Sequence, residues 1–288
     1  MTDATFFRRV AIIGTGLIGG SFALALRKHS FGISIVGFDR QGPLDRALGR
    51  RVVDEAAAGI AEAVRGADLV YVALPIAATI EALPTIAAAA APQALVTDAC
   101  STKAVICRIA GPEFKGHAMF LGGHPLAGKE HSGIDQADAD LFHDAPYALV
   151  RPDDENDARL REFTHLLHSF SARPVWCDPE THDWAVGIVS HLPQLVSIAL
   201  ASVVQDETDE TGLPLTLAGQ GLEDVLRLAG SPYGIWRDIL LTNSENIGRA
   251  LDRLAQAIDN LRTHLTSKEL VQEFHTANEL YNLLHKTE

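Results

Sequence analysis

The stretch VAIIGTGLIGGSFALAL, residues 10–26, places four glycines between two apolar segments of different character. Its first four residues form an apolar run that is typical of a buried parallel strand. The apolar residues of its second half recur at helical spacing. Because glycine is costly inside an ordered element, such a cluster indicates a sharp turn or a backbone that another group approaches closely. The stretch therefore predicts a strand, a tight turn and a helix in direct succession.

Three of these glycines, Gly14, Gly16 and Gly19, fit the pattern G-x-G-x-x-G of a dinucleotide-binding turn. In such a turn the first glycine makes the bend, the second lets a pyrophosphate reach the backbone, and the third allows helix and strand to pack closely. The helix start, at Leu17 and Ile18, offers N–H groups and a partial positive charge to the phosphates. We expect these five residues to bind a dinucleotide. The alternative is a tight turn without a ligand.

A second predicted strand, residues 34–38, ends directly before Asp39. An acidic residue about 20 positions after the glycine turn is where the ribose hydroxyls of NAD are held. Asp39 would repel the 2′-phosphate of NADP, although Arg40 follows immediately and is able to pair with that phosphate. Pro75 ends another buried strand and lies at the expected mouth of the cofactor site. The predicted cofactor is therefore NAD in preference to NADP.

Composition narrows the class of protein. A chain of 288 residues exceeds what one core usually needs, so two domains in contact are expected. A net charge of −13 argues against a nucleic-acid or anionic membrane surface. Three cysteines without a C-x-x-C pair suit a reducing, cytoplasmic location. The N-terminal segment lacks a signal-peptide core, and prolines interrupt the Ala-rich stretch 82–97, so no membrane span is expected.

Strand and helix patterns alternate up to about residue 178, which predicts a doubly wound, parallel α/β sheet of Rossmann type with helices on both faces. From there on only long helical patterns follow, over residues 184–204, 215–228, 235–265 and 268–285. We therefore expect a dinucleotide-binding domain over residues 1–178 and an all-helical substrate and dimerisation domain over residues 179–288.

The C-terminal half repeats apolar residues at helical spacing, at Leu251, Leu254, Ile258 and Leu261. Such a face needs a partner surface. That surface is either the core of the same chain or a second copy, and we expect both to contribute. The predicted assembly is a homodimer through the helical domain.

Ligands of open sheets bind outside the carboxyl ends of the strands, and three polar stretches are expected there. In TDACSTK, Ser101 lies at a helix start, where capping and a catalytic contact are both open. In GGHPLAGKEHSG, glycines bracket His124 at a strand end, and its near-neutral pKa suits proton transfer. In HDWAVGIVSHLPQL, His182, His191 and Gln194 are either ordinary polar residues or part of the same site.

The loop histidines carry no metal-site pattern. They recur seven residues apart without a framework of cysteines or carboxylates: His117, His124 and His131. A structural or catalytic zinc site needs such a framework. No metal is predicted.

Five motifs occur together in one order, namely GTGLIGGS (14–21), DACSTK (98–103), GHPLAG (123–128), SHLP (190–193) and the set Arg227, Trp236 and Asn243. In this order and spacing they resemble the prephenate/arogenate dehydrogenase family of tyrosine biosynthesis, over nearly the whole chain. The resemblance implies a Rossmann-type domain followed by a helical dimerisation domain. It also implies NAD-dependent oxidative decarboxylation of prephenate to 4-hydroxyphenylpyruvate; with arogenate the product is tyrosine.

The resemblance also implies roles for individual residues. His124 resembles the catalytic histidine that bonds the ring C4 hydroxyl, and Ser101 resembles the serine beside that hydroxyl and the nicotinamide. The residues that it assigns to substrate binding are Arg227, which grips a carboxylate, together with His191, Trp236 and Glu130.

Three positions depart from the family pattern. Gln194 stands where many members have histidine, Leu222 where phenylalanine is common, and Glu223 where a basic residue is common. The loss of two cationic groups favours tolerance of an ammonium on the substrate side chain. We therefore expect prephenate to be the main substrate, with measurable turnover of arogenate.

Two other classes of protein share some of these features. A dehydrogenase of related build, acting on β-hydroxy acids, would have the same glycine turn but a catalytic lysine in its helical domain. A non-catalytic NAD-binding sensor would leave His124, Ser101 and Arg227 without a purpose.

Overall fold

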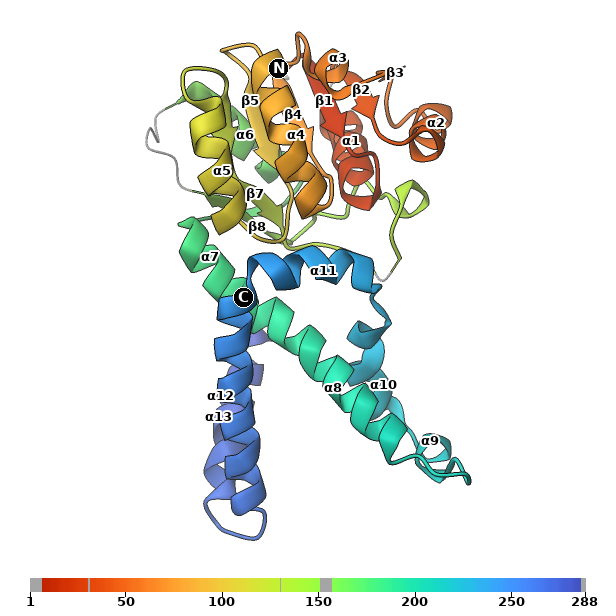
Figure 1. Cartoon of the computed structure of the whole chain (residues 1–288), viewed down its shortest axis with the longest axis vertical. Helices are drawn as coiled ribbons and strands as arrows, with labels where there is room; N and C mark the ends of the chain where they lie inside the picture. Colours follow the sequence, from red (N-terminus) through yellow and green to blue (C-terminus); the bar gives the residue numbers. More distant parts are fainter. Residues whose placement is uncertain (1–6, 31, 130, 151–156, 286–288) are drawn as a thin grey trace.

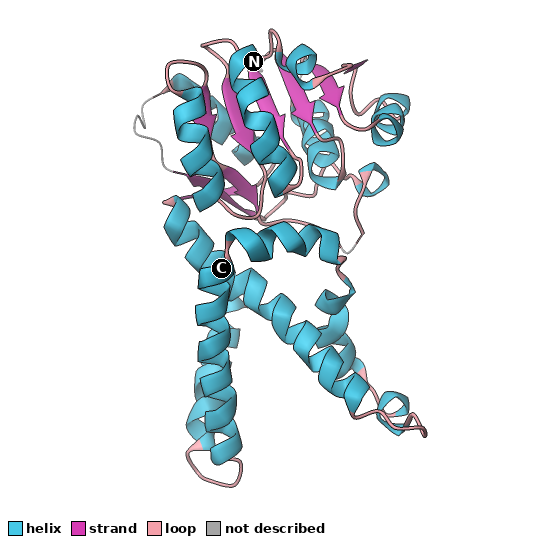
Figure 2. Ribbon diagram, in the orientation of Figure 1, coloured by secondary structure: helices cyan, strands magenta, loops and turns pink. Residues whose placement is uncertain are grey.

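The computed structural model describes residues 7–30, 32–129, 131–150 and 157–285. An α/β part contains all the strands of these residues, and α-helices diverge from it as two long arms (Figures 1 and 2). A six-stranded parallel sheet in the order β3-β2-β1-β4-β5-β6 forms its centre. Its strands are β1 (Arg9–Ile13), β2 (Ser34–Phe38), β3 (Glu55–Ala56), β4 (Leu69–Val72), β5 (Leu95–Asp98) and β6 (Met119–Leu121).

Helices cover both faces of this sheet, as a doubly wound fold requires. They are α1 (Leu17–His29), α2 (Gln41–Gly49), α3 (Ile60–Val64), α4 (Ile76–Ala89), α5 (Ala104–Phe114) and α6 (Ala158–Ser169). Successive residues of β1 point to opposite faces: Val10 and Ile12 pack in one cluster with residues of α1 and α6. Ala11 and Ile13 pack in the other, with residues of α3, α4 and α5. Both clusters are buried. The apolar run of β1 is therefore buried on both faces of the sheet, as its sequence predicts.

The later strands do not continue the parallel sheet, and this part of the sequence-based expectation is wrong. A second sheet is formed by β7 (Gly123–Pro125), β8 (Pro146–Val150) and β9 (Arg173–Cys177), with β7 antiparallel to β8. Only Gly122 separates β6 from β7. A strand that pairs in parallel with the strand before it needs a crossover of a dozen or more residues, so β7 is too close in sequence to pair in parallel with β6. A Cβ on Gly122 would lie 2.7 Å from the Cys107 sulfur and 2.9 Å from a methyl group of Val150, so a larger residue at this bend would displace these side chains.

The C-terminal part is helical, as predicted, but its elements are shorter. They are α7 (Pro179–Val186), a π-helical turn (Gly187–His191), α8 (Leu192–Asp206), α9 (Leu213–Thr216), α10 (Gln220–Leu226), a 3₁₀ turn (Arg227–Gly230), α11 (Tyr233–Thr242), α12 (Ser244–Thr263) and α13 (Leu270–Leu284). The single helix expected over residues 235–265 breaks at Asn243. The Asn243 amide donates to the Asp183 carbonyl oxygen at 2.7 Å, so a tertiary contact accompanies the break.

One continuous helix among the described residues, Pro179–Asp206, is long and apolar enough to cross a membrane by length and composition. The mean hydropathy of its most apolar window is 1.6, and 28% of that window is buried. A helix that packs against other protein surfaces passes the same test, so this one helix is weak evidence for a membrane.

The carboxyl ends of the parallel strands meet at one edge of the sheet, and α11 runs across this edge (Figure 1). Asp238 of α11 accepts a hydrogen bond from the N–H of Ala77 at the start of α4, at 3.0 Å. The helical part therefore closes over the edge where an open sheet binds its ligands.

Candidate active site

The glycine turn has the geometry of a dinucleotide site. Gly14 has a φ of +97°, and a Cβ there would lie 2.4 Å from the Ala73 carbonyl oxygen. A Cβ on Gly19 would lie 1.9 Å from the Gly14 carbonyl oxygen, so helix and strand pack too closely for a side chain. A Cβ on Gly16 would meet no atom within 4 Å, and no side chain caps α1 at this residue. The start of α1 therefore has open space beside Gly16, which fits a pyrophosphate.

Asp39 is held beside this turn. Its Oδ2 accepts from the Thr15 backbone N–H at 2.7 Å and from the Thr15 hydroxyl at 3.1 Å, and its Oδ1 accepts from the Arg40 N–H at 2.7 Å. A carboxylate has further lone pairs, so ribose hydroxyls are able to donate to it as well. The Arg40 and Pro75 side chains are exposed at the same edge of the sheet, where they precede α2 and α4.

His124 lies within a strand and not in a loop, which corrects the sequence-based expectation. It is the middle residue of β7, opposite Ala148, and is only 8% exposed. Its Nδ1 lies 2.9 Å from Nε2 of His182. Burial lowers the pKa of His124 well below 6.5, and the nearby His182, Lys103 and His191 lower it further. The imidazole is therefore neutral at pH 7 and able to accept a proton.

Ser101 is not the cap of α5. The carboxylate of Asp183, from α7, accepts from the N–H groups of Lys103 and Ala104 at 2.7 and 2.9 Å and so caps this helix. Capping was one of the two roles left open for Ser101, and Asp183 fills it. Ser101 is partly exposed directly after β5, at the same sheet edge as His124. A contact with a ligand remains the interpretation of this serine.

Lys103 is fully buried and pairs with Asp98, which is also fully buried. Burial opposes the charged form of Lys103, but Asp98 together with Cys100 and Cys107 outweighs it, so the pKa of Lys103 is raised. Asp98 also accepts from the N–H groups of Cys100 and Gly123, at 3.0 and 3.2 Å. A buried charge pair with its other lone pairs satisfied is well placed to fix two loops against each other. This pair holds the segments that carry Ser101 and His124.

The helical part supplies a second wall of the candidate site, which includes His191 and Trp236. The first wall is the α/β part with the glycine turn, Ser101 and His124. His191 is 1% exposed, and burial lowers its pKa to about 4, against the opposing effect of Asp183. Its Nδ1 lies 3.1 Å from Nδ2 of Asn243, which donates to it. The ring of Trp236 meets the His191 ring edge-on, with the ring centroids 5.8 Å apart. Within the described ranges, Trp236 Nε1 is the buried side-chain nitrogen that lacks a hydrogen-bond partner, so this N–H is free for a ligand.

Gln194 and Arg227 lie at the end of this wall. Gln194 is 2% exposed, and its amide nitrogen donates to the Leu228 carbonyl oxygen at 2.9 Å. It therefore holds the 3₁₀ turn that carries Arg227, whose side chain is exposed. Glu130, the last of the predicted binding residues, lies outside the described residues.

Sequence reasoning missed the part that His182 and Asp183 play. The sequence leaves His182 either as an ordinary polar residue or as a member of the site, and it gives Asp183 no distinguishing pattern. Yet Asp183 contacts both His182 and the start of α5. The available signal was a histidine and a carboxylate, adjacent in sequence, in the first turns of a helix that directly follows the last strand.

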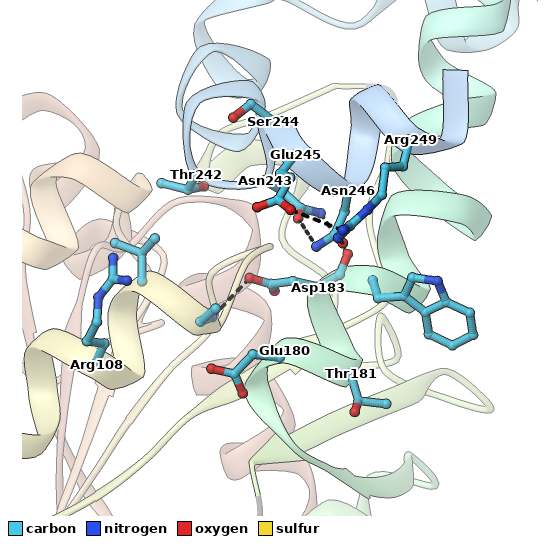
Figure 3. A pocket seen from close by; sticks show the side chains of 13 residues that line it. Arg108, Glu180, Thr181, Asp183, Thr242, Asn243, Ser244, Glu245, Asn246 and Arg249 are labelled. Atoms are coloured by element: carbon cyan, nitrogen blue, oxygen red, sulfur yellow. Dashed lines mark hydrogen bonds and ion pairs between the residues drawn. The ribbon is translucent and has the colours of Figure 1, made fainter. Parts of the chain in front are cut away.

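A cavity of about 610 Å³ lies where α5, α7 and the start of α12 meet (Figure 3). Asp183 and Asn243 border it, but none of the site residues predicted from the sequence lines it. Its charged lining residues are of both signs, and one arginine, Arg249, pairs with Glu245 at 3.0 Å. We therefore do not assign the substrate to this cavity. Among the residues that the structure describes, no group of three or more His, Cys, Asp or Glu side chains is arranged to hold a metal ion.

Two family models match the chain. One, described as prephenate dehydrogenase, nucleotide-binding domain, matches residues 22–176, and the other, prephenate dehydrogenase, dimerization domain, matches residues 178–278. A prephenate dehydrogenase of Bacillus subtilis is 33% identical over 277 residues, which are 94% of this chain and 74% of that protein.

Two solved structures are similar over almost their whole length. A prephenate dehydrogenase from A. aeolicus, in complex with hydroxyphenyl propionate and NAD+, has a TM-score of 0.88 at 26% identity and covers 96% of this chain and 98% of its own. Synechocystis arogenate dehydrogenase has a TM-score of 0.79 at 30% identity and covers 95% of this chain and 99% of its own.

Proposed function

Because the chain belongs to the prephenate dehydrogenase family, we propose that it catalyses the NAD-dependent oxidative decarboxylation of prephenate to 4-hydroxyphenylpyruvate. The observation that carries this proposal is a buried, neutral His124 at the sheet edge where the cofactor turn also opens. A neutral histidine in a dry site is the kind of general base that removes a hydroxyl proton. The sensor alternative leaves that histidine and its supports without a purpose.

We assign the cofactor to the glycine turn. Gly14 and Gly19 shape the turn, Gly16 leaves room for the pyrophosphate, and the N–H groups at Leu17 and Ile18 bind it. Asp39 holds the ribose hydroxyls, Arg40 lies next to them, and Pro75 borders the nicotinamide end. Bound NAD+ supplies the acceptor for the hydride that leaves C4 of the substrate.

We assign proton removal to His124. Its Nε2 accepts the proton of the C4 hydroxyl as the C4–H bond breaks, and loss of CO2 from C1 then completes the aromatic ring. Ser101 orients the same hydroxyl. Because the imidazole is neutral before reaction, no proton has to leave it first. The wall behind His124 is dry, which strengthens its hydrogen bonds.

We assign substrate binding mainly to the helical wall. An arginine fork holds a carboxylate with two parallel hydrogen bonds, and Arg227 is the candidate for this role. We assign the N–H of Trp236 and the ring of His191 to contacts with the same ligand, and Glu130 is assigned on resemblance alone. Gln194 shapes the pocket through the turn that carries Arg227.

Arogenate is the second candidate substrate. Gln194 is a neutral amide where many relatives have histidine, and Glu223 adds an exposed carboxylate to the same part of the chain. Both changes remove positive charge that would repel an ammonium. We propose turnover of both substrates, with prephenate preferred.

The proposal includes the organisation of the chain. A dinucleotide-binding domain spans residues 1–178, and a helical substrate and dimerisation domain spans residues 179–288. A homodimer through the helical domain would cover the apolar side chains that α12 and α13 expose, among them Leu251, Ile258, Leu261, Phe274 and Leu280. We expect a cytoplasmic enzyme with a small-molecule substrate and with no nucleic acid, membrane or metal as partner.

Formation of NADH in the presence of prephenate or arogenate tests this function. We expect NADH from both substrates, more efficiently with prephenate, and none with a β-hydroxy acid. Absence of NADH with both cyclohexadienyl substrates would refute the proposal.

A further inference from the structure

Three buried side chains form one hydrogen-bonded series between the two parts of the molecule. Nδ1 of His124, in β7, lies 2.9 Å from Nε2 of His182 in α7. Nδ1 of His182 in turn lies 2.8 Å from Oδ1 of Asp183. The three residues are 8%, 3% and 2% exposed, so water does not compete for these contacts.

One arrangement of protons satisfies both contacts of the series with uncharged imidazole rings. A carboxylate only accepts hydrogen bonds, so Nδ1 of His182 carries a proton and donates it to Asp183. In this arrangement the other nitrogen of His182, Nε2, is bare and accepts from Nδ1 of His124. His124 is itself neutral, because burial lowers its pKa well below 6.5. Its remaining nitrogen, Nε2, therefore has a free lone pair.

We propose that His182 is a positioning residue for the reaction: held by Asp183, it keeps His124 in the Nδ1–H tautomer, so that Nε2 is free for the C4 hydroxyl proton. The inference rests on the proposed function. When the substrate proton moves to Nε2 of His124, the Nδ1–H proton stays in its hydrogen bond to His182. The positive charge that forms on His124 thus has an acceptor 2.9 Å away.

The backbone of α5 keeps Asp183 in place. The N–H groups of Lys103 and Ala104 donate to its two oxygens, and Figure 3 shows Asp183 directed at the start of this helix. The charged amine of Lys103 does not compete for Asp183, because it pairs with Asp98. Asp183 is therefore a fixed acceptor, and the ring of His182 has one preferred orientation.

Two substitutions at His182 separate positioning from packing. Phe fills a similar volume but offers no acceptor to His124, whereas Gln has a carbonyl oxygen that accepts and an amide that donates to Asp183. We expect His182→Phe to lower kcat by about 10- to 100-fold with little change in KM, since complete loss of the correct tautomer costs about 10⁴ in a comparable triad. His182→Gln should recover much of this loss.

A direct readout of the tautomer needs no substrate. Nitrogen-15 spectra of the histidine rings distinguish a protonated from a bare nitrogen, and comparison with His124→Asn assigns the signals of His124. We expect Nδ1–H with bare Nε2 in the wild type and in His182→Gln. In His182→Phe the Nε2–H form should become populated, because the acceptor is gone.

Asp238→Asn is the matched control. It weakens another contact between the helical part and a helix start, the partly buried hydrogen bond from Ala77 to Asp238, and among the described residues the contacts of Asp238 include no histidine. We expect this variant to keep kcat within about threefold of wild type and to leave the His124 signals unchanged. An equal loss of kcat in Asp238→Asn and His182→Phe would overturn the inference, because it would reduce the effect to interdomain packing.

The outcomes distinguish this inference from the proposed function. If wild type does not reduce NAD+ with either substrate, the function fails, while the ring spectra still test the tautomer. If wild type is active and His182→Phe keeps its kcat, positioning by His182 is refuted. Should His182→Phe fail to fold, the wild-type spectrum decides, since an Nε2–H signal from His124 contradicts the inference.

Discussion

The two parts of the molecule bury apolar side chains very differently. Four of the five residues of β1 and all of β4 and β5 are buried, and the large apolar residues exposed before residue 178 are Leu48 and Val175 within the described ranges. From residue 179 on, the buried apolar residues described are Val186, Ile239, Ile247 and Ala250, whereas exposed ones recur along every arm. The α/β part therefore completes its own core, and the helical part relies on a further surface.

This contrast extends to the candidate active site. The first wall, with His124 and the cofactor turn, is built on strands whose cores are complete within the chain. The second wall, with His191 and Trp236, lies on helices whose outer faces remain apolar and exposed. We infer that the first wall is preformed in a single chain and that the second is stabilised by assembly. Five predictions test this difference, in decreasing order of the expected effect.

The first prediction concerns the preformed wall. His124→Asn should fold and bind NAD+ as wild type does, yet lose about two to four orders of magnitude in kcat, the usual contribution of a general base. Steady-state kinetics and calorimetric NAD+ binding measure the two properties. A kcat near that of wild type would remove His124 from the mechanism.

The second prediction concerns the assembled wall. Leu251→Asp on α12 should weaken the dimer by at least about 100-fold, or about 3 kcal/mol, because each copy would bring an unpaired carboxylate into an apolar interface. Leu48→Asp on α2 is the control, since the two leucines are 38% and 41% exposed. Sedimentation should show monomers for Leu251→Asp only, with lower kcat/KM for prephenate and unchanged binding of NAD+. If the Leu251→Asp variant remains a dimer, the interface does not include this face of α12.

The third prediction uses the histidine of the helical wall. The pKa of His191 is lowered from 6.5 to about 4, so the unfolded chain binds more protons than the folded one between these values. Its contribution to stability is therefore complete above pH 6.5 and decreases as the pH falls, by about 3 kcal/mol at pH 4. Denaturant unfolding should show a flatter dependence on pH in His191→Gln than in wild type. If the free energy of unfolding changes equally with pH in the two proteins, the lowered pKa of His191 is contradicted.

The fourth prediction returns to the cofactor turn. Wild type should use NAD+ more efficiently than NADP+, because Asp39 accepts from ribose hydroxyls and repels a 2′-phosphate. Asp39→Ser keeps an acceptor for Thr15 but removes the charge, and should narrow the preference by about tenfold. The measured quantity is the ratio of kcat/KM for the two cofactors. A ratio that favours NADP+ in wild type would be incompatible with this role.

The smallest expected effect is at Gln194. Gln194→His should raise the preference for prephenate over arogenate by about threefold, because a cationic ring disfavours the substrate ammonium. The comparison requires kcat/KM for both substrates in both proteins. No arogenate turnover by wild type, or an unchanged ratio, would show that this residue does not influence specificity.

Sequence reasoning succeeded where the signal was local. The glycine turn, the α1 start and the Asp39 position follow from backbone requirements within about 30 residues, and the structure contains each of them. It was wrong where contacts between segments far apart in the sequence determine the local structure. The strand that carries His124 belongs to a mixed second sheet, and the expected helix over residues 235–265 breaks at Asn243, whose side chain bonds to α7.

The alternation of strands and helices, the dinucleotide turn and the identity of the chemical groups follow from local sequence, because periodicity and glycine placement act between near neighbours. Only the tertiary structure decided the contact between His124 and His182, because these residues of β7 and α7 lie 58 positions apart in the chain. It also decided that Asp183, and not Ser101, caps α5. Hydrogen bonds between remote residues have no periodic signature, so they become visible only when folding brings their donors and acceptors together.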